Sequence, residues 1–89
     1  MNIRDRLQEM YPDVPLLFMI EEVFDKAIIG VSERIGDEPS VAYDYDKVIE
    51  ANIEMGMSYE EAIEYFSVNQ IGAYMGEHTP VFITKLDEE

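Results

Sequence analysis

The spacing of apolar and polar positions predicts a β-hairpin in the middle of the chain. Apolar and polar residues alternate over 29–35 and again over 40–43, as they do in strands that bury one face. The segment 36–39 between them reads Gly-Asp-Glu-Pro, a composition typical of turns. We therefore expect two antiparallel strands joined by this turn.

A helix is expected directly after the hairpin. The segment 45–55 has the apolar spacing of an amphipathic helix, with a single amide, Asn52, interrupting its apolar stripe. Asp44 precedes the segment and can accept a hydrogen bond from a free N–H of the first turn. Gly56 follows it and suits the left-handed conformation in which many helices end. The pattern thus bounds this helix at both ends.

A second helix is expected to begin after Ser58, because Ser58 and Glu61 have the spacing of a capping box. Apolar residues at helical spacing predict that it continues to about Met75. Residues 76–80 include Gly and Pro, which interrupt a helix, and 81–84 has the composition of a short strand. That strand is free to join an edge of the hairpin.

The beginning of the chain is less regular. Apolar residues over 3–11 share one helical face, and Asn2 can cap that helix. The two prolines of 12–15 prevent the helix from continuing. Residues 16–31 fit a helical stripe, whereas 16–20 equally suits a short buried strand, so both alternatives stay open.

Together these elements predict a small single domain of the α+β class that spans 1–89. In it, the β-hairpin and a C-terminal strand pack against two or three helices. Residues 1–23 carry the weakest pattern, and 86–89 form an acidic tail. A hydrophobic content of 47% is enough for a folded core, so the acidic residues decorate a folded body.

The charge of the chain narrows the partners that it is expected to have. It contains 20 Asp and Glu residues against 6 Lys and Arg, a formal net charge of -14. Such a chain repels phosphate, so we expect no direct binding of nucleic acid. The absence of cysteine agrees with a reducing cytoplasm, and no apolar run approaches the roughly 20 residues that span a bilayer. We expect a cytoplasmic protein that needs no membrane and no cofactor.

The second predicted helix, 59–75, is apolar around most of its circumference, and a chain of 89 residues has little material to cover it. Either the rest of the domain covers this helix, or the helix contacts a protein partner or a second copy of the chain. Tyrosine is frequent in the cores of such interfaces. The residues expected there are Tyr59, Tyr65, Val68, Ile71 and Tyr74.

Carboxylates along the same two helices suggest a form for that interaction. Spaced acidic groups can imitate phosphates and occupy the basic groove of a nucleic-acid-binding protein, although such groups also simply maintain solubility. The leading interpretation is a non-enzymatic protein-binding module, with acidic inhibition or nucleic-acid mimicry as one form of it. The surface would consist of Glu50, Glu54, Glu60, Glu61 and Glu64.

A second interpretation is a small ligand-binding domain or weak enzyme built around Asn69, Glu77, His78 and Thr79. Asn69 and Gln70 stand where apolar residues are expected, which predicts buried amides that require partners in the fold, in a ligand or in a second chain. His78 beside Glu77 has the makings of a general base. No nucleophile accompanies it, however, and a loop histidine is most often solvated, so we predict no catalytic residue.

A metal site is not expected either. Asp44 and Asp46, with Glu50 one turn later, offer oxygen ligands of the kind that Mg²⁺ or Ca²⁺ binds. A chain with this many carboxylates produces such spacings by chance, and Asp44 is already expected to cap a helix. The solvated interpretation of these carboxylates is therefore preferred.

From Phe24 onward the chain resembles a family of small acidic proteins of bacteria and their phages whose function is not established. The residues that carry the resemblance are 24–30 (FDKAIIG), 42–47 (AYDYDK), 57–62 (MSYEEA), Asn69, Gly72, Ala73, Gly76, Thr79 and Pro80. The resemblance covers about the last two thirds of the chain. It implies a bacterial cytoplasm, or the cytoplasm of the host if a phage encodes the protein, and it implies no activity.

Overall fold

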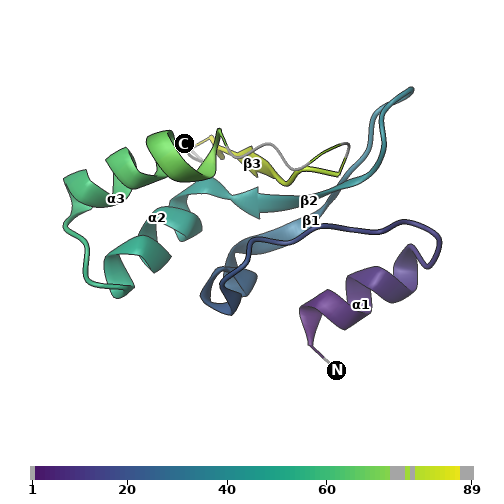
Figure 1. The fold of residues 1–89 in the computed structure, drawn as a ribbon, viewed down its shortest axis with the longest axis horizontal. Helices are drawn as coiled ribbons and strands as arrows, with labels where there is room; N and C mark the ends of the chain where they lie inside the picture. The colour runs from purple at the N-terminus through teal and green to yellow at the C-terminus, as the bar shows by residue number, and fades with distance from the viewer. Residues whose placement is uncertain (1, 73–75, 77, 87–89) are drawn as a thin grey trace.

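The computed structural model of this chain describes residues 2–72, 76 and 78–86. Its elements, in chain order, are α1 (Ile3–Met10), the 3₁₀-helix η1 (Glu22–Ala27), β1 (Ile28–Ser32), β2 (Ser40–Asp44), α2 (Tyr45–Glu54), α3 (Tyr59–Tyr65), the π-helix η2 (Phe66–Gln70) and β3 (Val81–Ile83). The α+β class, with a hairpin and a C-terminal strand beside helices, is confirmed (Figure 1).

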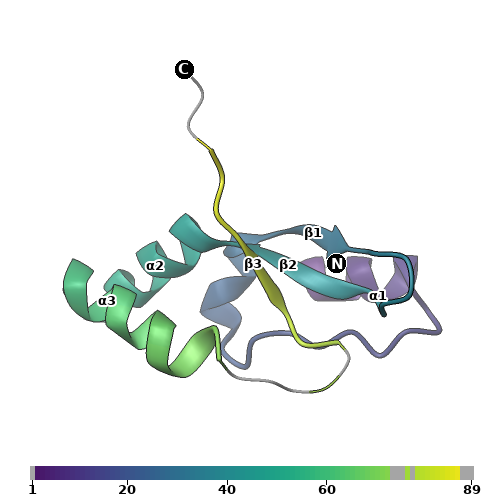
Figure 2. The same ribbon diagram turned by 90° about the horizontal axis from the view of Figure 1, so that it is seen from above.

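A three-stranded sheet in the order β1-β2-β3 forms the middle of the domain. β1 and β2 pair in antiparallel fashion, which confirms the predicted hairpin, and β3 pairs in parallel with the other edge of β2. Every residue of β2, the central strand of the sheet, is buried. Figure 2 shows α2 and α3 at one end of the sheet, while the chain after β3 leaves the body of the domain.

The helix ends lie largely where the sequence predicts them. Asn2 accepts a hydrogen bond from the backbone N–H of Asp5, and the Asp44 carboxylate accepts one from the N–H of Asp46 at 3.0 Å. The capping box of Ser58 and Glu61 is complete, since each side chain bonds the backbone of the other. Each cap satisfies an N–H that the first turn leaves open.

The extent of the second predicted helix is wrong. The regular α-helix ends at Tyr65, and the chain continues as one wide turn in which the N–H of Ile71 donates to the carbonyl of Phe66 at 2.9 Å. Apolar spacing does not distinguish such a turn from a regular helix, and π-turns are frequent at functional sites. The predicted residues 73–75 lie outside the described part of the chain.

Four aromatic rings join the helices to the sheet. Tyr43 of β2 lies opposite Phe82 of β3, with ring centres 5.8 Å apart. Phe82 makes an edge contact with Phe66 at 4.9 Å, and Phe66 makes another with Tyr45. Fully burying a side chain such as Phe66 contributes about 1.5 to 3 kcal/mol. These contacts hold the end of α3 against β3.

The segment 16–31, for which both a helix and a short strand were open, is neither throughout: 16–21 has no regular secondary structure, 22–27 is the 3₁₀-helix η1, and 28–31 belongs to β1. Leu16 and Met19 are buried in the core, whereas Ile20 is 83% exposed. Among the residues that the structure describes, no helix has both the length and the apolar character needed to cross a membrane.

Candidate binding surface

A pocket of about 170 Å³ lies where three distant segments meet. The chain just before η1 forms one wall, the end of α3 with η2 forms another, and β3 with the two residues before it forms the third. The lining is largely apolar, and a few polar groups contribute to it. It consists of Met19, Ile20, Glu21, Tyr65, Asn69, Gln70, Thr79, Pro80 and Phe82.

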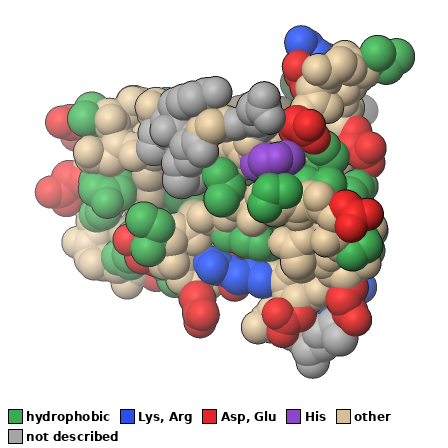
Figure 3. All heavy atoms as spheres, turned by 45° about the vertical axis from the view of Figure 1, so that its right-hand side comes forward, with side chains coloured by type: hydrophobic (Ala, Val, Ile, Leu, Met, Phe, Trp, Pro, Cys, Tyr) green, Lys and Arg blue, Asp and Glu red, His purple; other side chains and the backbone are tan. Residues whose placement is uncertain are grey.

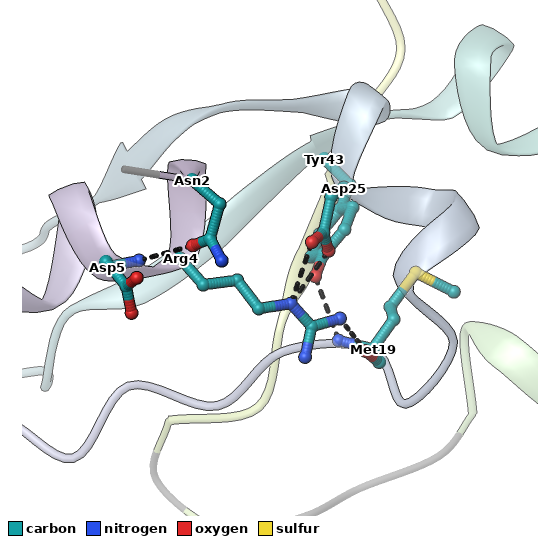
Figure 4. A network of polar contacts seen from close by, with 6 residues as sticks. All are labelled: Asn2, Arg4, Asp5, Met19, Asp25 and Tyr43. Carbon is teal, nitrogen blue, oxygen red and sulfur yellow. Dashed lines mark hydrogen bonds and ion pairs between the residues drawn. The ribbon is translucent and has the colours of Figure 1, made fainter.

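The first wall is fixed by a polar network that begins on α1 (Figure 4). Arg4 Nε donates to both carboxylate oxygens of Asp25 at 2.9 Å, and Arg4 Nη2 donates to the Met19 carbonyl at 2.7 Å. The Met19 N–H donates to the hydroxyl oxygen of Tyr43 at 2.8 Å. Burial is the main reason that the pKa of Tyr43 is raised, so this buried hydroxyl stays neutral. Both backbone groups of Met19 are therefore occupied, which holds this wall in place.

The second wall depends on a pair of amides. Asn52 of α2 is fully buried, and its Nδ2 donates to Gln70 Oε1 at 2.9 Å, while Gln70 Nε2 donates back to Asn52 Oδ1 at 3.2 Å. Asn52 Nδ2 also lies 3.3 Å from the carbonyl of Ala62 in α3. Asn52 thus ties α2 to the middle of α3 at Ala62 and to the end of η2 at Gln70.

The third wall is held in place by the pairing of β3 with β2 and by one ion pair from the chain that follows β3. Lys85 Nζ lies 3.1 Å from Asp44 Oδ2, and the Asp44 side chain is only 5% exposed. Burial alone would raise the pKa of Asp44, but the hydrogen bond and charge of Lys85, together with the N–H groups of Lys47 and Asp46, lower it overall. Asp44 therefore carries its charge in the folded protein and anchors the chain after β3.

A shallow hollow on the solvent side of α3 adjoins the pocket. Its lining is Met57, Glu61, Glu64, Tyr65, Val68 and Asn69. Tyr65 and Asn69 line both the hollow and the pocket, so the two depressions lie on either side of these residues. We call the hollow, the pocket and the helical surface between them the α3 face.

The predicted apolar interface residues are exposed on this part of the molecule. Tyr59 is 65%, Val68 68%, Ile71 57% and Tyr65 37% exposed, so the rest of the described chain does not cover them. Tyr74, the fifth predicted residue, lies outside the described residues. The alternative that the domain itself covers this helix is wrong for these four side chains.

The predicted acidic residues are exposed as well, but they differ in what they contact. Glu54 forms an ion pair with Lys26. Hydrogen bonds from Ser58 lower the pKa of Glu61, which is committed to the capping box. Glu50, Glu60 and Glu64 have no ion pair within the described part of the chain.

Basic residues are absent from this stretch of sequence: no Lys or Arg occurs between Lys47 and Lys85. Carboxylates are distributed widely over the surface as well. Figure 3 shows Asp and Glu side chains around the face that carries the histidine, and hydrophobic side chains lie next to the histidine. The exposed apolar side chains of α3 and η2 therefore lie in a stretch of sequence that contains carboxylates and no Lys or Arg, and Glu60 and Glu64 have no ion pair among the described residues.

Only part of the predicted ligand-binding group comes together. Asn69 and Thr79 both line the pocket. The Thr79 hydroxyl donates to the carbonyl of Gly76 at 2.6 Å. Glu77 lies outside the described residues, and His78 is not part of the lining. His78 is partly buried, and its Nδ1 lies 2.8 Å from the carbonyl oxygen of Pro39, so the expectation of a simply solvated ring is also wrong.

Of the two amides expected to be buried, Asn69 is exposed, so that prediction is wrong for Asn69, whereas Gln70 is partly buried and has a partner in the fold. The wide turn of η2 turns Gln70 toward α2, where it meets Asn52. The apolar stripe of α2 did contain a signal for this pair, namely the single amide at Asn52. No sequence signal pointed to Met19 or Phe82 as pocket residues, since each reaches the pocket through contacts that are remote in sequence.

Among the described residues, no group of three or more His, Asp or Glu side chains is arranged to hold a metal ion.

The fold and the surface define a small α+β domain with an apolar pocket beside an acidic, partly apolar helix face. Comparison with protein families, curated proteins and solved structures finds nothing that matches this chain.

Proposed function

We propose that this protein is a non-enzymatic binding module whose α3 face engages a basic segment of another protein. One observation carries the proposal: Tyr65 and Val68 are exposed next to Glu60 and Glu64, in a stretch of sequence without Lys or Arg. The proposed partner therefore offers apolar side chains together with Lys or Arg.

The exposed apolar residues supply the contact area. Clustered apolar side chains on a monomer surface, rimmed by polar groups, mark interaction sites more often than isolated ones do. Tyr65, Val68 and Ile71 lie within two helical turns of one another, and Met57 adds an adaptable thioether side chain. Covering them removes apolar surface from water, which favours association.

The charge favours a basic partner over a second copy of the chain. Two copies docked through their α3 faces would bring Glu60 and Glu64 of one copy toward those of the other, and neither carboxylate has an ion pair with a Lys or Arg among the described residues of its own chain. A partner with a basic surface turns the same charge into attraction and speeds the encounter. Self-association remains a result that the experiment below can reveal.

The resemblance to small bacterial and phage proteins suggests where such a partner is found. In a bacterial cytoplasm, extended basic surfaces belong mainly to proteins that bind nucleic acid, so an acidic module that covers one acts as an inhibitor. On this proposal the carboxylates stand in for phosphates, and direct binding of nucleic acid is not part of the function.

The experiment uses the purified protein as bait in a bacterial lysate, with charge-reversal and apolar variants beside it. We expect a protein retained by the wild type at low salt to be lost with Glu64→Lys and with Val68→Glu. The control Glu9→Lys on α1 makes the same charge change away from the α3 face, and it should retain the partner. Retention should also fall as salt screens the attraction.

Sedimentation equilibrium of the purified protein completes the test. Capture of the same proteins by all variants, or capture that does not respond to salt, would contradict the proposal. A salt-insensitive homodimer that Val68→Glu dissociates would show that the α3 face binds a second copy instead.

A further inference from the structure

We propose that the pocket beside Tyr65 receives one large apolar side chain, aromatic or long aliphatic, of the partner segment, next to a basic residue of that segment. This inference rests on the proposed function, because it concerns the same partner. The observation behind it is that Tyr65 and Asn69 line both the pocket and the acidic hollow. A segment that crosses Tyr65 reaches both depressions at once.

The size and lining of the pocket select the kind of group. A volume of about 170 Å³ is below the roughly 300 to 1,000 Å³ of sites that hold whole cofactors or drug-sized ligands. Phe82, Pro80 and Met19 give it an apolar interior, and Met19 adapts its shape to the group that enters. One bulky apolar side chain fits this description, and anchors of this kind dominate many interfaces.

The polar groups at the mouth of the pocket fit a peptide better than a free hydrocarbon. The side chain of Asn69 is exposed and can bond the backbone of a segment that lies across it. Glu21 is also exposed and lies on the opposite wall. A Lys or Arg beside the anchor would find Glu21 on one side and Glu64 on the other.

The pocket is built before any partner arrives. The Arg4 and Tyr43 hydrogen bonds hold Met19, and the Asn52 pair holds Gln70, so neither wall has to be ordered on binding. A preformed site avoids much of the entropic cost that a flexible one incurs. Ile20 lies at the rim and is 83% exposed, so a partner that covers it removes much apolar surface from water.

The test is an NMR titration of the ¹⁵N-labelled protein with three capped tripeptides, Lys-Trp-Lys, Lys-Ala-Lys and Glu-Trp-Glu. We expect Lys-Trp-Lys to shift the amide signals of Ile20, Asn69 and Phe82, with an affinity at least about tenfold higher than that of Lys-Ala-Lys. Glu-Trp-Glu should bind more weakly than Lys-Trp-Lys because of charge repulsion. Ile20→Ala should weaken Lys-Trp-Lys binding. The control Ile35→Ala, at a fully exposed side chain of the hairpin turn, should not.

The outcomes separate this inference from the proposed function. If Lys-Ala-Lys shifts the signals of Glu60 and Glu64 as strongly as Lys-Trp-Lys, and neither peptide shifts Phe82, the pocket proposal is overturned and the basic-partner proposal stands. If no peptide shifts either region, the pocket inference is overturned, whereas the proposed function is decided by the capture experiment with Glu64→Lys and Val68→Glu. Tight binding of N-acetyl-tryptophanamide alone, equal to that of the tripeptide, would identify a small-molecule site and would also overturn the inference.

Discussion

Asn52 and Gln70 exchange two hydrogen bonds across the contact between α2 and η2, one of 2.9 Å and one of 3.2 Å. Asn52 is fully buried, so this pair is the polar centre of an otherwise apolar contact. The amides also place Gln70 in the wall of the pocket. The same pair of side chains therefore contributes to the stability of the fold and to the shape of the pocket.

Replacing Asn52 should destabilise the fold. Asn52→Ala leaves the Gln70 amide without its partners and opens a small cavity, and we expect a loss of about 2 kcal/mol in the free energy of unfolding. Urea denaturation followed by circular dichroism measures it. The matched control is Asn69→Ala, an exposed amide in the same segment, which should change stability by less than about 0.5 kcal/mol. Equal losses in the two variants would contradict the role of the pair.

A sequence pattern predicts a contact of this fold only when the two residues that make it lie close together along the chain. The caps at Asp44 and Ser58 and the hairpin turn at 36–39 are local, since their partners lie two to three residues away or directly across the turn. Local spacing is what a sequence pattern records, so these features were predicted correctly. Even the strand after Pro80 was recognisable from composition alone.

The candidate site could not be predicted in the same way. Its walls depend on contacts between residues far apart in the chain, 18 residues for Asn52 with Gln70 and 21 for Arg4 with Asp25. A single amide or arginine carries no signal of its distant partner. Of the two amides that interrupt the predicted apolar stripe, the wide turn of η2 leaves Asn69 exposed and turns Gln70, which is partly buried, toward Asn52. In such a turn each N–H bonds the carbonyl five residues back instead of four, which alters the side chains that face the core.

Arg4 should contribute more to the stability of the fold than a typical surface arginine does. Its guanidinium bonds the Asp25 carboxylate and the Met19 carbonyl, lies 5.1 Å from the centre of the Phe18 ring, and is only 25% exposed. We expect Arg4→Ala to lower the free energy of unfolding by about 1 to 2 kcal/mol, since three partners lose a contact.

The control for Arg4 is Arg6→Ala, two residues later on the same helix. Arg6 is exposed and makes no ion pair within the described chain, so its removal should cost less than about 0.5 kcal/mol. The same urea measurement compares the two. Should both variants unfold at the same urea concentration, the network of Figure 4 would contribute little to stability.

The Asp44–Lys85 ion pair should make stability depend on pH in the acid range. The folded protein lowers the pKa of Asp44 below its ordinary value of 3.8, so the unfolded chain takes up this proton first as the pH falls. The pair therefore stabilises the fold above about pH 4, and the contribution is lost as the pH falls further.

Asp44→Asn isolates this charge, because asparagine still caps α2. We expect the difference in unfolding free energy between wild type and Asp44→Asn to be largest near pH 6 and to shrink below about pH 4. Lys85→Met should show the same pH profile, while Asp13→Asn, at an exposed carboxylate, should not. A difference that stays constant from pH 7 to pH 3 would rule out this assignment.

Neutralising the acidic residues of α3 should separate stability from binding. At a net charge of -14, removing negative charge reduces self-repulsion. We expect the double variant Glu60→Gln with Glu64→Gln to have a higher Tm than the wild type at low ionic strength, with part of the gain offset because the helix dipole favours the Glu60 charge in the first turn of α3. This gain should vanish in 1 M salt, where charges are screened within about 3 Å.

The same variant should associate with the captured partner about tenfold more slowly at low salt. The control Glu9→Gln with Glu38→Gln makes the same change in net charge at exposed positions away from the α3 face. It should raise the Tm at least as much and leave association unchanged. If the two double variants slow association equally, net charge alone drives the encounter, and the α3 face has no special part in it.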